Sequence, residues 1–98
     1  MIEKILRDKS PLHFSVLPTP LHKLETLSSK LGVNLYIKRD DLTGFALGGN
    51  KTRKLDYLIA EAKAKGYDTL IAPGANQSNF CRMAAGAGIT AGMEAWLL

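Results

Sequence analysis

Short apolar runs alternate with longer amphipathic segments along most of the chain. The runs are bounded by turn-forming residues, which is typical of short buried strands. We predict these strands at residues 34–38, 69–72 and 95–98. An order of strand, helix, strand, helix, strand with short connections is typical of an α/β fold in which helices cross over between parallel strands. The sequence therefore predicts an open, mostly parallel sheet with helical crossovers.

Three amphipathic segments predict helices, each followed by a glycine that suits a helix end. They are residues 21–31, 50–65 and 77–91. Asn50 is a candidate N-cap of the second helix, because its side chain can accept a hydrogen bond from a free backbone N–H. Residues 1–20 contain three prolines and predict an irregular lead-in. The chain stops inside an apolar strand at Leu98, so we expect residues 1–98 to be the N-terminal part of a longer protein; the alternative is a complete, very small α/β domain.

Composition excludes several classes of protein. The 98 residues are 46% hydrophobic and 22% charged, as in a single globular domain. The net charge of +4 comes from basic residues scattered among acidic ones without interleaved aromatics, which argues against nucleic-acid binding. No apolar run reaches the roughly 18 residues of a membrane span, and residues 1–9 lack the apolar core of a signal peptide. A lone cysteine, Cys81, excludes an internal disulfide, argues against a zinc site and fits a cytoplasmic protein.

Lys51 belongs to the first candidate site, the segment 48–55. At about 100° per residue, it shares a helix face with apolar residues further along. These are Leu55, Leu58, Ile59 and Ala62. Burial and the positive potential of a helix N-terminus both favour the neutral amine, which attacks a carbonyl carbon to form a Schiff base. The alternative is that the Lys51 side chain extends to water.

The same segment does not match a phosphate-binding Walker A motif. Asn50 separates the second glycine from Lys51, and the preceding residues 38–41 are charged. Lys54 and the free amides at the helix start remain suited to a phosphate group. Arg53 lies about 200° around the helix from Lys51, and we predict an ordinary solvated side chain there.

The second candidate site follows the predicted strand at 69–72. Gln77, Ser78 and Asn79 place three short polar side chains at a helix start, where open α/β sheets bind ligands and where unpaired amides suit a carboxylate. The alternative is that one of them is only an N-cap. Ser78 has no His or Asp at nearby spacing, so a hydrolase triad has no support. Cys81 is interpreted as a small buried residue rather than a reactive thiolate.

Four motifs, in this order, resemble those of the D-cysteine desulfhydrase and 1-aminocyclopropane-1-carboxylate deaminase family. They are the segments 17–21, 37–42, 48–55 and 77–79. Members of this family are enzymes that depend on pyridoxal 5'-phosphate and have the tryptophan synthase β fold. The resemblance covers about residues 15–92, so it implies part of such a domain and this cofactor.

The resemblance also implies roles for the residues of both sites. Lys51 matches the catalytic lysine that binds the cofactor covalently and later transfers protons. Asn79 matches the residue that hydrogen-bonds the pyridoxal 3′-oxygen. Lys54 is a weaker match for a contact to the cofactor phosphate, and Asn50, next to Lys51 in the motif, is assigned to the same cofactor site.

The substrate-binding residues implied are Gln77, Ser78 and Asn79. Ser78 matches a catalytic hydroxyl near the substrate, a nucleophile in the deaminases and a carboxylate contact in the desulfhydrases. Phe80 departs from both subfamilies, which commonly have His or Gln there, whereas Ala75 favours the desulfhydrase pattern. We therefore expect a lyase or deaminase of a small amino acid, with D-cysteine yielding sulfide, ammonia and pyruvate.

Two alternatives to a D-cysteine desulfhydrase remain open. The first is a deaminase of the cyclopropane amino acid, which would release ammonia and 2-oxobutanoate. The second is a catalytically inactive fragment or interaction module that folds or pairs with another chain. The resemblance suggests a homodimer of the full-length protein, and no nucleic-acid or membrane partner is expected.

Overall fold

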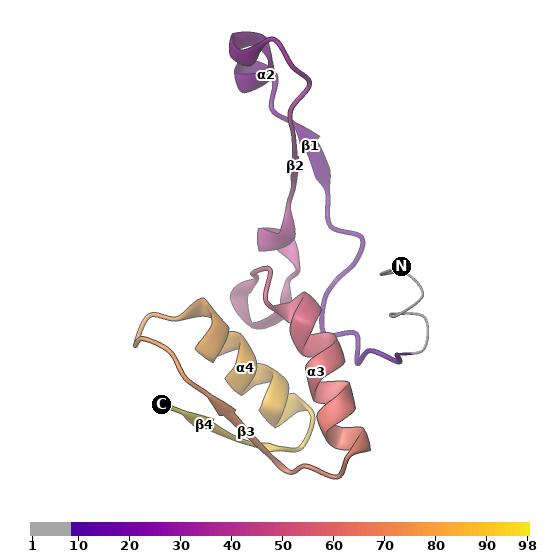
Figure 1. Cartoon of the computed structure of the whole chain (residues 1–98), viewed down its shortest axis with the longest axis vertical. Helices are drawn as coiled ribbons and strands as arrows, with labels where there is room; N and C mark the ends of the chain where they lie inside the picture. The colour runs from indigo at the N-terminus through magenta and orange to yellow at the C-terminus, as the bar shows by residue number, and fades with distance from the viewer. Residues whose placement is uncertain (1–8) are drawn as a thin grey trace.

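The structure is a computed structural model, and it describes residues 9–98. These residues form a body, made of two helices beside a pair of strands, and an arm that extends from it (Figure 1). The arm contains β1 (Leu21–Lys23), α2 (Glu25–Leu31) and β2 (Tyr36–Lys38). Two short 3-10 helices, η1 (Asp40–Leu42) and η2 (Phe45–Leu47), connect the arm to the body. The body contains α3 (Thr52–Ala64), β3 (Thr69–Ala72), α4 (Asn79–Thr90) and β4 (Glu94–Leu97).

The body is a β–α–β unit with one additional helix. Strands β3 and β4 pair in parallel, with Thr69 opposite Glu94 and Ala72 opposite Leu97, and α4 is the crossover between them. α3 packs beside α4 (Figure 1). The core lies between the helices and the strand pair, and its most buried side chains are Leu55, Ile59, Ala72, Met83, Ala84 and Ala87. The predicted strands at 69–72 and 95–98 and the predicted helix at 77–91 are thus confirmed to within one or two residues.

The prediction for the arm is wrong in two respects. Residues 21–23, predicted as the start of a helix, form β1, and the predicted strand at 34–38 pairs with β1 rather than joining the parallel sheet. This β1–β2 pair is antiparallel, with Leu21 opposite Lys38. The helical spacing of apolar residues in 21–31 is therefore realised only in α2, which ends as predicted at Gly32 with a positive φ of 67°.

The lead-in is irregular, as predicted for residues 1–20, although its first eight residues lie outside the described part of the chain. It is nevertheless anchored to the body. The backbone N–H of Phe14 donates to the side chain of Asp56 at 2.5 Å, and the N–H of Leu12 donates to the Asp56 carbonyl at 3.0 Å. The Phe14 ring also packs on Phe45, with centroids 5.0 Å apart. These contacts explain why Asp56, in the middle of α3, is only 3% exposed.

Two kinds of feature are absent from residues 9–98. Within this range, no helix combines the length and the apolar character that crossing a bilayer requires. The same residues contain no group of three or more His, Cys, Asp or Glu side chains placed to hold a metal ion.

Candidate functional site

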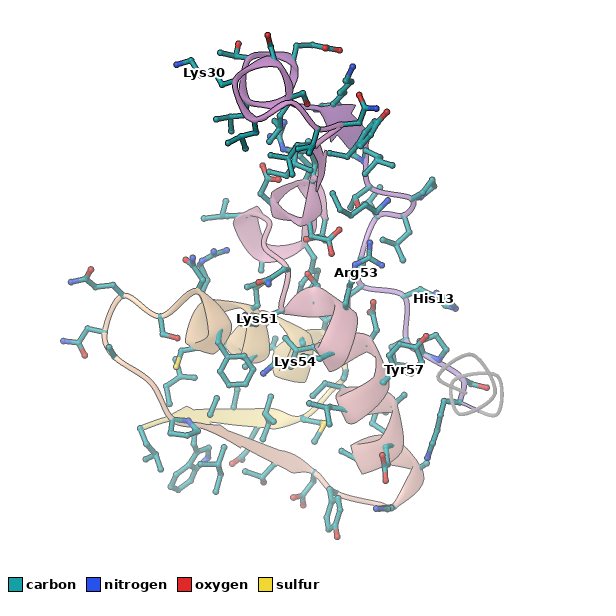
Figure 2. All side chains as sticks on the ribbon, turned by 45° about the horizontal axis from the view of Figure 1, so that its top comes forward. His13, Lys30, Lys51, Arg53, Lys54 and Tyr57 are labelled. Carbon is teal, nitrogen blue, oxygen red and sulfur yellow. The ribbon has the colours of Figure 1, made fainter. Side chains whose placement is uncertain are left out.

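The two candidate segments lie at the same end of the body, because α3 and α4 run in the same direction. At this end, Lys54 Nζ lies 4.1 Å from the ring centroid of Phe80, and Arg82 donates to the Gly48 carbonyl at 3.3 Å. At the opposite end, Lys63 Nζ donates to the Ala91 carbonyl at 2.6 Å. Figure 2 shows Lys51 and Lys54 at the start of α3, on the side where α4 begins. The first turns of both helices, with their free amides, therefore face the same region.

The loop before Lys51 is fixed by two threonines that the sequence analysis did not select. The Gly49 carbonyl accepts hydrogen bonds from Thr43 Oγ1 at 2.7 Å and Thr52 Oγ1 at 2.8 Å, and both threonine residues are completely buried. Gly49 has a φ of 135°, and a Cβ there would lie 2.7 Å from Met83 Cε of α4. The loop therefore packs closely on α4, and its positive φ favours glycine at this position.

Lys51 is half-buried and occupies the N-cap position of α3, so Asn50 is not the N-cap that the sequence predicts. The predicted apolar face is correct for Leu55 and Ile59, which are each 1% exposed, but wrong for Leu58, which is 52% exposed. The buried face is turned toward Thr52 and Asp56, because those side chains bind the loop and the lead-in. Lys51 consequently lies at the flank of the buried face instead of at its centre.

Arg53 is not the solvated side chain that the sequence predicts. Its guanidinium binds both oxygens of Asp40, with Nη2 2.9 Å from Oδ1 and Nε 2.5 Å from Oδ2. Thr19 donates to the same carboxylate at 2.6 Å. The Arg53 guanidinium and the Thr19 hydroxyl lower the pKa of Asp40 to about 2. This cluster joins the base of the arm to the first turn of α3; sequence spacing gave no indication of it, because the partner lies 13 residues away in η1.

The second candidate segment forms a tight turn into α4. Ser78 is the N-cap, and its Oγ accepts from the Cys81 N–H at 3.2 Å, so the N-cap alternative holds for this residue. A Cβ on Gly74 would lie 2.5 Å from Cys81 Sγ, which shows how closely the turn folds back. Cys81 is buried, as predicted.

Asn79 and Gln77 differ in their surroundings. Both residues are exposed, and Asn79 differs in that its Oδ1 accepts a hydrogen bond from Arg82 Nη2 at 3.1 Å. A small cleft lies beside this turn at the carboxyl edge of the strand pair, lined by Gly74, Ala75, Asn76, Cys81, Leu97 and Leu98. Like Thr43 and Thr52, Arg82 was not predicted from the sequence, because its hydrogen bonds go to a backbone oxygen and an amide oxygen and leave no motif.

A β–α–β unit whose polar residues gather at the carboxyl edge of its strands and at two helix N-termini defines an α/β ligand-binding fold. The family model described as "Pyridoxal-phosphate dependent enzyme" matches residues 12–98, and the chain belongs to this family. The predicted fold class and family resemblance are therefore confirmed, and pyridoxal phosphate is the cofactor of the family.

Two enzymes and one solved structure that resemble the chain agree with this family assignment. The chain is 51% identical over 83 residues to a D-cysteine desulfhydrase of Salmonella typhimurium, covering 85% of this chain and 25% of that protein. It is 53% identical over 77 residues to a D-cysteine desulfhydrase of Salmonella paratyphi B, covering 79% of this chain and 24% of that protein. A crystal structure described as an ACC deaminase homologue matches with a TM-score of 0.88 and 40% identity, over 98% of this chain and 30% of that one. The chain thus spans about a quarter of the length of these curated relatives.

Proposed function

We propose that the full-length protein is a pyridoxal-phosphate-dependent lyase that converts D-cysteine to sulfide, ammonia and pyruvate. The similarity to two D-cysteine desulfhydrases supports this substrate. The observation that carries the proposal is that the loop before Lys51 and the start of α3 pack against the first turn of α4. Arg82 of α4 contacts Gly48, and Lys54 of α3 contacts Phe80. These contacts bring the side chains of two lysines, Lys51 and Lys54, and the amide of Asn79 to one end of the body.

The chemistry of these side chains fits the proposed cofactor. The Lys51 amine is suited to the cofactor aldehyde, and the amide of Asn79 is suited to its ring oxygen, since Asn79 Oδ1 is held by Arg82 and Nδ2 remains to donate. Lys54 and the first amides of α4 are suited to anionic groups. Asn50 is exposed beside Lys51 and completes the proposed set.

The proposed reaction assigns proton transfer and substrate binding to this chain's own residues. When bound, pyridoxal phosphate supplies the electron-accepting ring that makes a substrate bond next to the amino group easier to break. Lys51 Nζ is the proposed base, which takes a proton from the substrate carbon and returns it later. Gln77, Ser78 and the free amides of the α4 first turn bind the substrate carboxylate and orient the bond to be broken.

The hydrogen bond of Ser78 favours one of the two roles that the family resemblance left open. Because Ser78 Oγ accepts from the Cys81 N–H, the hydroxyl proton is left to donate, as a carboxylate contact requires. A nucleophilic role would require a base to remove that proton. No side chain among residues 9–98 forms a hydrogen bond with Ser78 in which it could act as that base. Within residues 9–98, the hydrogen bonding of Ser78 is therefore suited to a carboxylate contact, the role that the resemblance gives this residue in the desulfhydrases.

The lysine assignment is tested by borohydride reduction of the full-length protein with bound cofactor. Reduction should attach the cofactor irreversibly to Lys51, and peptide mass spectrometry should locate the modification in the peptide that contains it. The Lys51→Ala variant should remain unlabelled, because a methyl group offers no amine. Labelling of Lys54 or another lysine in place of Lys51 would contradict the proposed role.

The substrate assignment is tested by product analysis with two amino acids. D-Cysteine should yield sulfide and pyruvate, whereas 1-aminocyclopropane-1-carboxylate would yield 2-oxobutanoate and no sulfide. The structural similarity to an ACC deaminase homologue makes the second activity the alternative function. Turnover of the cyclopropane amino acid alone would replace the D-cysteine proposal by this alternative.

Location and assembly complete the proposal. The single cysteine of the chain supports a reducing cytoplasmic location, and the family resemblance supports a homodimer. Sedimentation equilibrium of the full-length protein tests the assembly, and a mass of one chain would contradict it.

A further inference from the structure

Arg82 connects the two segments of the proposed site. One guanidinium nitrogen, Nη2, donates to Asn79 Oδ1 at 3.1 Å and to the Gly48 carbonyl at 3.3 Å. Asn79 lies one turn earlier on the same helix, whereas Gly48 lies three residues before Lys51 in a different segment. A single side chain therefore bonds both to the amide proposed for the cofactor oxygen and to the loop that carries the proposed cofactor lysine.

The bond to Arg82 determines how the Asn79 amide is turned. A guanidinium has only donors, so it must bind the amide oxygen and not the amide nitrogen. With Oδ1 held at 3.1 Å, the Asn79 Nδ2 group is the end available to donate to an anionic oxygen. Without Arg82, nothing in this pair would prevent the amide from presenting its oxygen to the same anion, which would be repulsive.

The backbone at Gly48 is also packed closely against Asp41. Gly48 has a φ of 81°, and a Cβ there would lie 2.4 Å from the backbone oxygen of Asp41. The neighbouring Gly49 carbonyl is held by Thr43 and Thr52. Arg82 supplies the hydrogen bond from α4, so the position of the loop before Lys51 depends on both elements.

Helix stability alone does not explain an arginine at this position. A cation in the first turn of a helix is disfavoured by the helix dipole, and α4 has no acidic residue in its first turn to offset it. Arg82 Nη1 is also buried without a hydrogen-bond partner among residues 9–98, which carries a desolvation cost. Residues that are unfavourable for both the helix dipole and desolvation are typical of functional sites.

We propose that Arg82 is a positioning residue that holds the Asn79 amide nitrogen ready for the cofactor oxygen and links it to the Lys51 loop. This inference rests on the proposed function, because the group that Asn79 would bind is the proposed cofactor. Arg82 itself need not touch that group.

A double-mutant cycle on the full-length protein tests the proposal. The variants are Arg82→Met, Asn79→Ala and the double variant, and the dissociation constant of pyridoxal phosphate is measured by absorbance titration. Each single substitution should raise this constant by about 10- to 100-fold, since a hydrogen bond to a charged group is lost or misdirected. The double variant should bind more tightly than the product of the two single effects would give, because Arg82 acts in large part through Asn79.

Spectroscopy separates positioning from a general loss of structure. The pH titration of the bound cofactor's absorbance should shift in the same direction in Arg82→Met and Asn79→Ala. Thermal unfolding without cofactor reports folding independently. If Arg82→Met does not fold, Arg82→Lys, which keeps the charge and one donor, replaces it in the same cycle.

Arg39→Met is the matched control, because Arg39 forms an ion pair with Asp41 at 2.7 Å at the base of the arm, and among residues 9–98 its side chain bonds only to Asp41 and His22. It should leave the dissociation constant unchanged. The inference is overturned if Arg82→Met binds the cofactor like wild type, or if the effects of Arg82→Met and Asn79→Ala simply add. Wild-type protein that is not labelled at Lys51 would instead overturn the proposed function itself.

Discussion

Lys51 and Arg53 are two residues apart, yet their electrostatic surroundings differ. Arg53 is engaged by Asp40 and Thr19, so its charge is neutralised at the base of the arm. For Lys51, no carboxylate among residues 9–98 lies within ion-pair distance. Arg53 thus fixes the first turn of α3 to the base of the arm, whereas Lys51 is the residue that we propose binds the cofactor.

Replacing Asp40 by Asn should destabilise the protein in a pH-dependent manner. Because the pKa of Asp40 is lowered to about 2 in the folded protein, its ion pair contributes fully above pH 4 and is lost as the pH falls toward 2. Asp40→Asn should therefore reduce the free energy of unfolding by about 1 kcal/mol at pH 7 and by less at pH 2. Urea unfolding of the full-length protein at a series of pH values measures this difference.

Asp41→Asn is the control for that experiment, because Asp41 pairs with Arg39 in a more exposed position. Its effect at pH 7 should be smaller than that of Asp40→Asn. A loss for Asp40→Asn that is the same at pH 2 and pH 7 would show that the ion pair is not its source.

At the level of elements, the accuracy of prediction depends on how local the determining contacts are. Thr69–Ala72 and the helix ended by Gly92 are specified by their own residues, and both are predicted correctly. β1 was missed because Leu21–Lys23 becomes a strand only by pairing with Tyr36–Lys38, across the intervening α2. A pairing at this separation leaves no periodic pattern of its own in the sequence.

For the candidate site too, a residue was predicted only where its signal is local in the sequence. Lys51 and Asn79 were found because motifs mark them, although their roles remain predictions. Thr43, Thr52 and Arg82 were missed because their partners include the backbone carbonyls of the Gly48–Gly49 loop. Any residue type supplies a carbonyl, so such a bond becomes visible only when the chain is folded.

Gly48→Ala should test how firmly this loop is fixed. At φ 81° an alanine is strained, and its Cβ would meet the Asp41 oxygen at 2.4 Å, a backbone atom that cannot rotate away. We expect a loss of about 2–4 kcal/mol in the free energy of unfolding and weaker cofactor binding, because the loop before Lys51 must shift. Chemical denaturation and cofactor titration of the full-length protein measure the two effects.

Gly66→Ala isolates the contribution of backbone strain. Gly66 has nearly the same φ, 80°, but nothing lies within 4 Å of its added Cβ. We expect a loss of about 1 kcal/mol and unchanged cofactor affinity. Equal losses for the two variants would mean that the contact with Asp41 is unimportant.

Over the whole molecule, α3 and α4 run in the same direction, so the candidate site residues lie at one end of the helix pair and a structural contact lies at the other. Their first turns carry the candidate residues, together with Lys54 over Phe80 and Arg82 on Gly48. At the other end, Lys63 of α3 donates a hydrogen bond to the Ala91 carbonyl at the C-terminal end of α4. A cation at this position also interacts favourably with the helix dipole of α4. Contacts at the two ends should therefore affect different properties.

Lys63→Met and Lys54→Met test this separation in the full-length protein. Lys63→Met removes a hydrogen bond and a favourable charge, so it should lower the free energy of unfolding of the cofactor-free protein by about 0.5–1 kcal/mol. It should leave the dissociation constant of pyridoxal phosphate unchanged. Lys54→Met keeps an apolar contact with the Phe80 ring, since methionine also packs well on aromatic rings, and should have little effect on stability.

The same Lys54→Met substitution should raise the dissociation constant about tenfold, because it removes a cation proposed to bind the cofactor phosphate. Stability must be compared without cofactor, since a bound ligand itself stabilises the folded state. If Lys63→Met weakened cofactor binding as much as Lys54→Met, the site would depend on the helix pair as a rigid unit, not on the end at which its residues lie. The predicted contrast requires that the opposite end of the helices serve only to hold them together.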